Sequence, residues 1–190
     1  MIRVDPRRSR LIATRMLVRG MLAVATIFVA TASAADAAVE DAKLTPLVAG
    51  VWIAGQITPQ QVEGLAARGM TAIIDLRPGD EEPGQPSSQQ VGAAAERAGL
   101  TFSHAPVEDG VPPQSAVDAV SRALLHPGTT AVLCCHSGRQ AARTWALAEA
   151  SRSGGLEAEA IEAVAKSAGQ SLDDLREQIA ARIATRVKWP

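Results

Sequence analysis

The sequence predicts an α/β domain in which helices flank a mainly parallel sheet, followed by a helical extension at the C-terminus. Short apolar runs alternate along the chain with segments of helical periodicity, which is the pattern of βαβ units. The run at 71–76 is apolar at nearly every position, as in a strand that is covered on both faces. Beyond the glycine pair at 154–155 only helical patterns remain, which indicates the extension.

The strands are expected where short apolar runs are bounded by turn or helix signals. The first run closes at Gly55, and the last leads directly into a small polar loop. The expected strands are 51–54, 71–76, 100–106 and 131–135.

The helices are expected from their start and stop signals. The first has Thr58 as its cap, Pro59 at the first helical position and Gln61 at the third, and it ends at Gly69. The last is expected to begin with Ser171 as its cap. The expected helices after the first are 89–98, one marked by Val117, Val120 and Leu124, one containing Trp145 and Leu147, 161–166, and 172–183.

Residues 1–34 have the three parts of a secretory signal peptide. Residues 1–20 carry six arginines against one aspartate, residues 21–30 are apolar, and small residues follow at 31–35. The apolar run is short for a bilayer span. We therefore expect cleavage after Ala34 and a periplasmic mature protein that is not held in a membrane. A buried amphipathic N-terminal helix is the alternative.

Composition restricts the kind of partner. The formal net charge of −1 gives no reason to expect nucleic acid, and the few aromatic residues make binding by base stacking a poor fit. The three histidines, His104, His126 and His136, do not have metal-ligand spacing around the cysteines. No metal and no cofactor are expected.

The two cysteines, Cys134 and Cys135, are adjacent, so they could join only as a strained vicinal disulfide. A fold that is stabilised by several disulfides is therefore excluded.

Cys135 stands at the carboxyl end of its expected strand, where ligand sites lie in parallel sheets. The loop that follows can turn backbone N–H groups inward, and the next helix adds its positive dipole end. Gly138 allows close approach of the backbone to a ligand. This arrangement favours a thiolate at Cys135 that acts as a nucleophile; an inert buried cysteine is the alternative.

Several short motifs occur in the order found in one known family. They are Gln56-Ile57-Thr58-Pro59, the acidic Pro- and Gly-rich stretch 75–88 that begins Asp75-Leu76-Arg77-Pro78-Gly79, Gly99-Leu100, His104-Ala105-Pro106-Val107, Cys135-His136-Ser137-Gly138, and Trp145-Ala146-Leu147. Over residues 45–150 the chain resembles the phosphatase-like domain of beta-lactamase hydrolase-like proteins, which is also described as a sulfur transferase. The resemblance implies a domain at 45–153 with the fold of tyrosine and dual-specificity phosphatases, leaving 154–190 as the helical extension.

The resemblance also implies a mechanism through phosphocysteine and a phosphorylated small molecule or protein as substrate. It places a general acid in the loop after the third strand, where Asp109 stands; an ordinary turn aspartate before Gly110 is the alternative. The expected catalytic residues are Cys135 and Asp109, and the expected anion-binding residues are His136, Ser137, Gly138, Arg139, Gln140 and Arg143.

Some neighbouring residues have a structural explanation as well. Arg77 either lines the site or pairs with Glu81 or Glu82, and pairing is favoured. His104 is expected to be packed and hydrogen-bonded, and Trp145 to lie in the core. His136 either adds positive charge beside the thiol or is an exposed loop residue.

The cysteine loop departs from the family pattern, which resembles Cys-x-Ser-Gly-x-Arg-Ser. Gln140 stands at the Arg position and Ala141 at the following hydroxyl position. Arg would hold two phosphate oxygens and keep its charge, whereas Gln brings no charge. Arg139 and Arg143 are the candidates to replace it. With Cys134 as nucleophile Arg139 would have the right spacing but Gly138 would not, so Cys135 is preferred.

The sequence therefore predicts a periplasmic, cysteine-dependent, phosphatase-like hydrolase. The alternatives are a rhodanese-like sulfur transferase, a catalytically weak pseudo-enzyme that binds an anion or a partner, and a thiol-redox role for the cysteine pair.

Overall fold

A computed structural model describes residues 40–79 and 83–187 of the chain. The expected signal peptide at 1–34 lies outside these residues, as do Glu81 and Glu82. Among the helices of the described part, none is long and apolar enough to cross a membrane.

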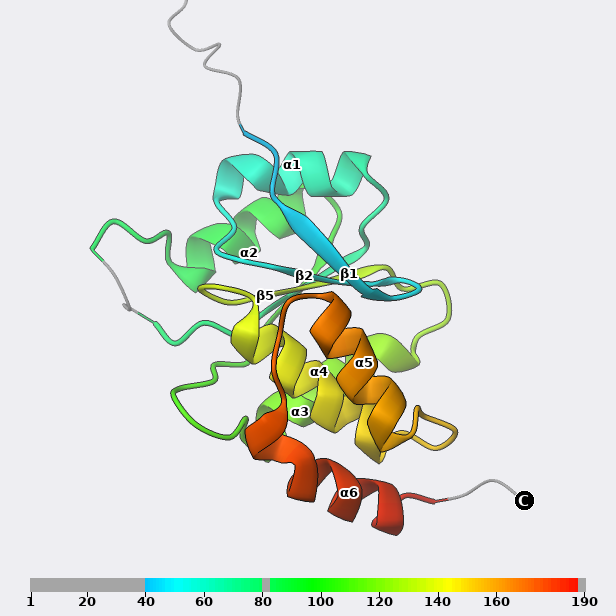
Figure 1. Cartoon of the computed structure of the whole chain (residues 1–190). Coiled ribbons are helices and arrows are strands. Elements are labelled where there is room, and N and C mark those ends of the chain that lie inside the picture. Colours follow the sequence, from blue (N-terminus) through cyan, green and yellow to red (C-terminus); the bar gives the residue numbers. More distant parts are fainter. Residues whose placement is uncertain (1–39, 80–82, 188–190) are drawn as a thin grey trace, which may run out of the picture. The chain divides into compact units, whose positions relative to one another are not determined.

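A five-stranded sheet divides the described part into two layers of helices (Figure 1). Its strand order is β1-β2-β5-β3-β4, with β1 antiparallel to β2 and every other pair parallel. The strands are β1 (Leu44–Val48), β2 (Val51–Ala54), β3 (Ala72–Asp75), β4 (Thr101–His104) and β5 (Ala131–Cys134). The mainly parallel sheet predicted from the alternation of elements is confirmed.

Two helices cover one face of the sheet and the remaining helices cover the other (Figure 1). On the first face lie α1 (Pro59–Ala67) and α2 (Ser88–Arg97). On the second lie α3 (Gln114–Leu125), α4 (Arg139–Ser151), α5 (Ala158–Ser167), the short 3₁₀ helix η1 (Asp173–Leu175) and α6 (Arg176–Thr185). Trp145 of α4 is fully buried on the second face, so its expected place in the core is confirmed.

The strand β1 was not expected from the sequence, which predicted 51–54 as the first strand. Pro46 weakens its strand pattern, because proline cannot donate a ladder hydrogen bond. The strand lies at the sheet edge, where that loss is tolerated, and its pairing with β2 is irregular between Pro46 and Val48. Gly50 makes the tight turn between the two strands with a φ of 77°.

Helix caps were predicted correctly at the start of the domain and wrongly near its end. Thr58 and Gln61 form the expected reciprocal capping box of α1. Ser171 does not cap the last α-helix: its hydroxyl accepts the N–H of Asp173 at 3.3 Å and so initiates the 3₁₀ turn, and α6 begins only at Arg176. A serine cap and a serine turn use the same local hydrogen bond, so the sequence does not distinguish them.

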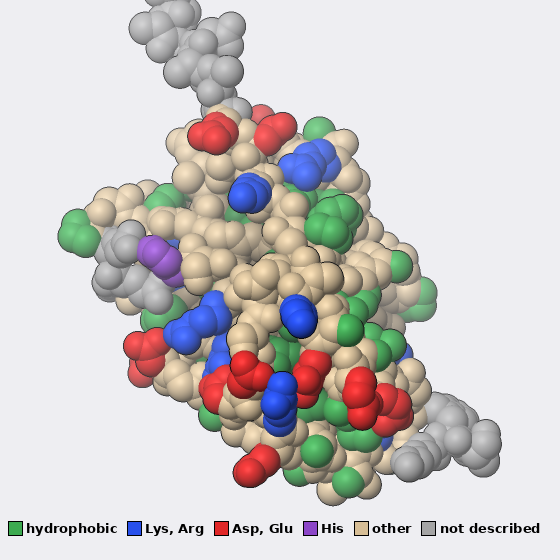
Figure 2. All heavy atoms as spheres, viewed as in Figure 1, with side chains coloured by type: hydrophobic (Ala, Val, Ile, Leu, Met, Phe, Trp, Pro, Cys, Tyr) green, Lys and Arg blue, Asp and Glu red, His purple; other side chains and the backbone are tan. Residues whose placement is uncertain are grey.

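The C-terminal extension shares the core of the domain. Ile161, Leu175 and Ile179 are fully buried in the same cluster as Trp145, and α4 packs against both α5 and α6. On the face seen in Figure 2, basic and acidic side chains are interspersed over the extension. One example is Arg176, which pairs with Glu162 and Asp173.

Candidate active site

The loop after β5 brings a cysteine sulfur against a backbone donor. Cys135 follows the last residue of β5, the central strand, and its own N–H donates to the Ala54 carbonyl at 3.4 Å. Gly138 has a φ of 85°, which favours glycine, and its N–H donates to Cys135 Sγ at 3.1 Å. Helix α4 begins at the next residue, so its positive dipole end also faces this loop.

Cys135 lines a cavity of about 610 Å³ whose walls follow three parallel strands. The segment after β3 contributes Leu76 and Pro78, the segment after β4 contributes Val107, Glu108 and Asp109, and the segment after β5 contributes Cys135, His136, Ser137, Arg139 and Gln140. Carboxyl ends of parallel strands meet at one edge of a sheet, as expected for a ligand site in this class of fold.

Most of the residues predicted for the site are brought together by the structure. Both predicted catalytic residues line the cavity, and so do four of the six predicted anion-binding residues; Gly138 takes part through its N–H. Arg143 is the exception. Its Nη1 donates to Asp174 Oδ1 at 2.6 Å and its Nη2 to the Gly110 carbonyl at 3.0 Å, so the structure does not place it in the cavity.

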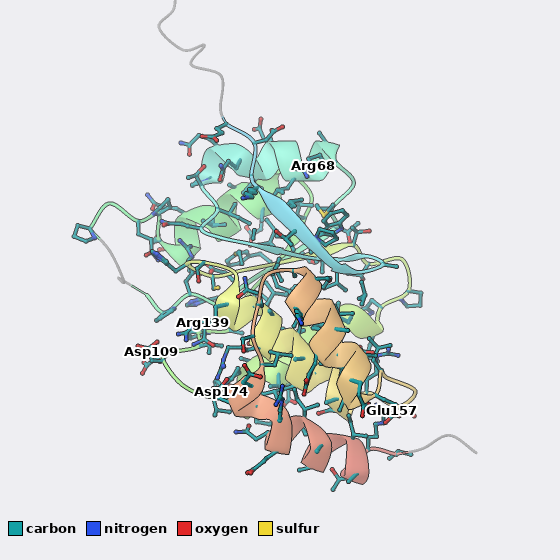
Figure 3. The ribbon with its side chains drawn as sticks, viewed as in Figure 1. Arg68, Asp109, Arg139, Glu157 and Asp174 are labelled. Atoms are coloured by element: carbon teal, nitrogen blue, oxygen red, sulfur yellow. The ribbon has the colours of Figure 1, made fainter. Side chains whose placement is uncertain are left out.

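The side chain at the family's arginine position is engaged with the opposite wall. Gln140 is 9 % exposed, and its Nε2 donates to the Glu108 carbonyl at 3.0 Å. Gln140 is neutral, so the arginine that lines the cavity is its neighbour Arg139. It lies 3.5 Å from an Asp109 oxygen and both side chains are exposed, so this pair contributes little stability (Figure 3).

The two cysteines face opposite sides of the sheet, because successive side chains of a strand alternate. Cys134 packs in the α1–α2 core and Cys135 in the core under α3 and α4, and both are free thiols. Burial, with the neighbouring Asp75 carboxylate 3.7 Å from the sulfur, raises the pKa of Cys134 well above its ordinary value. Cys134 is therefore a poor nucleophile, and the orientation of the pair does not support a vicinal disulfide.

A buried ion pair stands beside the cavity. Arg77 donates from Nε and Nη2 to the two carboxylate oxygens of Asp75, at 2.9 and 2.7 Å, and both side chains are almost fully buried. Burial raises the pKa of Asp75, but hydrogen bonds from Arg77 and Ser88 more than offset this and leave it lowered. Asp75, two residues upstream, is thus a partner of Arg77 that the sequence did not suggest; the pairing with Glu81 or Glu82 stays a prediction, because both lie outside the described residues.

The backbone of Arg77 also contacts the side chain of His104. Its Nε2 lies 2.9 Å from the Arg77 carbonyl, so the predicted hydrogen bond is confirmed, but the residue is exposed at the end of β4 and the predicted packing is wrong. The Asp75-Leu76-Arg77 spacing at the end of a strand is the signal that could have identified the pair. Among the described residues no cluster of histidine, cysteine and carboxylate side chains could hold a metal ion.

Comparison with known proteins gives a consistent result. Residues 43–152 match the family model described as "Beta-lactamase hydrolase-like protein, phosphatase-like domain". A curated beta-lactamase hydrolase-like protein of Xylella fastidiosa is 36% identical over 97 residues, which are 51% of this chain and 22% of the relative. One from Agrobacterium fabrum is 32% identical over 98 residues, 52% of this chain and 23% of the relative. The chain thus spans less than a quarter of these relatives.

Solved structures with the same fold are phosphatases. A candidate phosphatase from Neisseria meningitidis has a TM-score of 0.61 at 27% identity, over 72% of this chain and 96% of that one. Kinase associated phosphatase, with its catalytic-site cysteine replaced by serine, has a TM-score of 0.61 at 11% identity, over 77% and 98%. The core catalytic domain of a PP-IP phosphatase from S. cerevisiae, in complex with citrate, has a TM-score of 0.52 at 14% identity, over 77% and 87%. The last two show likeness of fold alone.

Proposed function

Since the chain belongs to the phosphatase-like domain family of beta-lactamase hydrolase-like proteins, we propose that it is a cysteine-dependent hydrolase of phosphomonoesters with Cys135 as the nucleophile. The observation that carries the proposal is the Cys135 sulfur, which accepts a backbone N–H at the start of α4 and lines the cavity. Backbone donors and a helix N-terminus stabilise both a thiolate and a bound oxyanion.

The reaction proceeds in two steps. The thiolate forms a bond to phosphorus while the ester P–O bond breaks, and the departing alkoxide takes a proton from the Asp109 carboxyl group. Water then attacks phosphorus, the S–P bond breaks, and the Asp109 carboxylate takes the proton of the water. The loop N–H groups and Arg139 stabilise the charge on the transferring phosphoryl group in both steps.

The substrate is a phosphorylated small molecule or protein, and the phosphatase-like fold supports this class in general. We place the mature chain in the periplasm, on the basis of the basic, apolar and small-residue segments of residues 1–35. A mature N-terminus near Ala35 in a periplasmic fraction is expected, and an intact N-terminus in the cytosol would contradict this location.

One observation favours a second candidate, an oxyanion-binding protein with little turnover. Gln140 replaces the arginine of the family loop, and its amide is bound to the Glu108 backbone. Without the charged fork of an arginine the transition state is less stabilised than in an intact phosphatase loop.

The two candidates, and a sulfur transferase, are separated by assays of the purified chain. We expect slow release of phosphate from p-nitrophenyl phosphate and no thiocyanate from thiosulfate plus cyanide. Thiocyanate without phosphate release would support the sulfur transferase instead. Binding of phosphate without formation of either product would favour the oxyanion-binding protein.

A further inference from the structure

Side chains of helix α4 contact three consecutive residues, 108–110, of which Glu108 and Asp109 line the cavity. We call residues 108–110 the acid loop, because Asp109 lies at its centre. Each loop residue contacts a different side chain near the start of α4: Glu108 carbonyl with Gln140 Nε2 at 3.0 Å, Asp109 carboxylate with Arg139 Nη2 at 3.5 Å, and Gly110 carbonyl with Arg143 Nη2 at 3.0 Å. The position of Asp109 over the cavity therefore depends on the side chains of α4.

Of these three side chains, Arg143 is the one most constrained by its surroundings. It is 4 % exposed, whereas the side chain of Arg139 is 58 % exposed and its contact with Asp109 is long. A buried guanidinium is stable only with a charged or hydrogen-bonding partner. Arg143 has that partner in Asp174, at 2.6 Å from its Nη1.

Asp174 belongs to the 3₁₀ helix η1 of the C-terminal extension, outside the region that matches the family. Figure 3 shows Asp109, Arg139 and Asp174 on the same side of the molecule. One guanidinium thus joins the acid loop to the extension, through the Gly110 carbonyl on one side and the Asp174 carboxylate on the other.

The link is present at neutral pH. The hydrogen bond from Arg143 is the main reason that the pKa of Asp174 is lowered. A lowered pKa means that the carboxylate stays ionised even below its ordinary titration range, so the pair is fully present above that range and is lost only as the pH falls through the lowered value. Replacing the carboxylate by an amide removes the charge that balances Arg143 without changing the size of the side chain.

We propose that Asp174 is a positioning residue for Asp109: it fixes the guanidinium of Arg143, which in turn fixes the backbone of the acid loop at the cavity wall. The C-terminal extension thereby becomes part of the active-site apparatus. The catalytic half of this inference rests on the proposed phosphatase function, because it assigns the general acid to Asp109; the structural half does not.

The structural half is tested without any substrate. A glutamate-specific protease cleaves after Glu108, and in the native protein its rate follows the population of the opened loop. We expect Asp174→Asn to raise this cleavage rate about fivefold or more. The matched control is Asp173→Asn, the neighbouring residue, which pairs with Arg176 and not with Arg143. Asp174→Glu, which keeps the charge, is expected to stay near the wild-type rate.

The catalytic half is tested on substrates with good and poor leaving groups. If Asp109 is mispositioned, Asp174→Asn lowers kcat about tenfold for phenyl phosphate, less for p-nitrophenyl phosphate, and changes KM little. Unchanged cleavage after Glu108 in Asp174→Asn, or an equal increase in Asp173→Asn, would overturn the proposal. Faster cleavage in Asp174→Asn alone, with no turnover in any variant, supports the positioning of the loop and contradicts the proposed phosphatase function.

Discussion

Cys135→Ser is expected to reduce phosphomonoester hydrolysis about a thousandfold or more, as loss of the nucleophile does in other covalent enzymes. A serine hydroxyl fills nearly the same space, so the loop and its Gly138 N–H remain, but it does not ionise near neutral pH and is a much weaker nucleophile. The measurement is the initial rate of phosphate release, with circular dichroism to verify that the variant is folded.

Cys134→Ser is the matched control. Cys134 is equally buried but packs in the α1–α2 core beside Asp75, away from the cavity. We expect it to keep most of the wild-type rate. Loss of activity in Cys134→Ser together with a nearly normal rate in Cys135→Ser would reverse the assignment of the nucleophile.

Gln140→Arg is expected to raise kcat/KM for a phosphomonoester about a hundredfold, since a charged bidentate contact in a preorganised loop contributes about 3 kcal/mol to the transition state. The side chain at 140 lines the cavity near the start of α4. In the wild type its Oε1 is a buried acceptor without a hydrogen-bond partner among the described residues, which is unfavourable next to an oxyanion. Arginine removes that acceptor and has enough donors for both Glu108 and the phosphoryl group.

Gln140→Lys separates charge from geometry. A lysine brings the same charge as a single point and not as a planar fork, so its gain should be clearly smaller. Adding Cys135→Ser to Gln140→Arg should abolish the gain. If Gln140→Arg is neutral while Arg139→Ala removes an existing activity, then Arg139 already holds the anion and the account of position 140 is wrong.

The parallel sheet could be predicted because its signals are local. The buried runs at β3 and β5 are apolar at almost every position, and the first helix has a complete capping box. The edge strand β1 could not, because Pro46 argues against a strand until the position of that strand at the sheet edge is known.

The candidate site was predictable to the same extent. Cys135 follows from its place at the end of a central strand, and the Gly138 N–H from the loop that starts α4. Which arginine reaches the cavity depends on tertiary contacts. Arg143 lies only one turn beyond Gln140, yet it is directed away by Asp174, a residue 31 positions further along the chain. Arg77 and Asp75, by contrast, lie two residues apart at the end of β3, so their pairing could have been inferred from the sequence; only their burial depends on tertiary packing.

The central claim is that Cys135 is the reactive thiol of an oxyanion-binding loop, and the alkylation rates of the two cysteines test it most directly. Iodoacetamide labelling of the native protein, followed by mass spectrometry of the peptide that contains both, gives each rate separately. We expect Cys135 to react clearly faster than Cys134, because Cys135 lines the cavity and accepts a backbone N–H, whereas burial and Asp75 suppress the Cys134 thiolate. Phosphate or vanadate should slow the labelling of Cys135 alone. Equal rates at the two positions, unaffected by either oxyanion, would contradict the account.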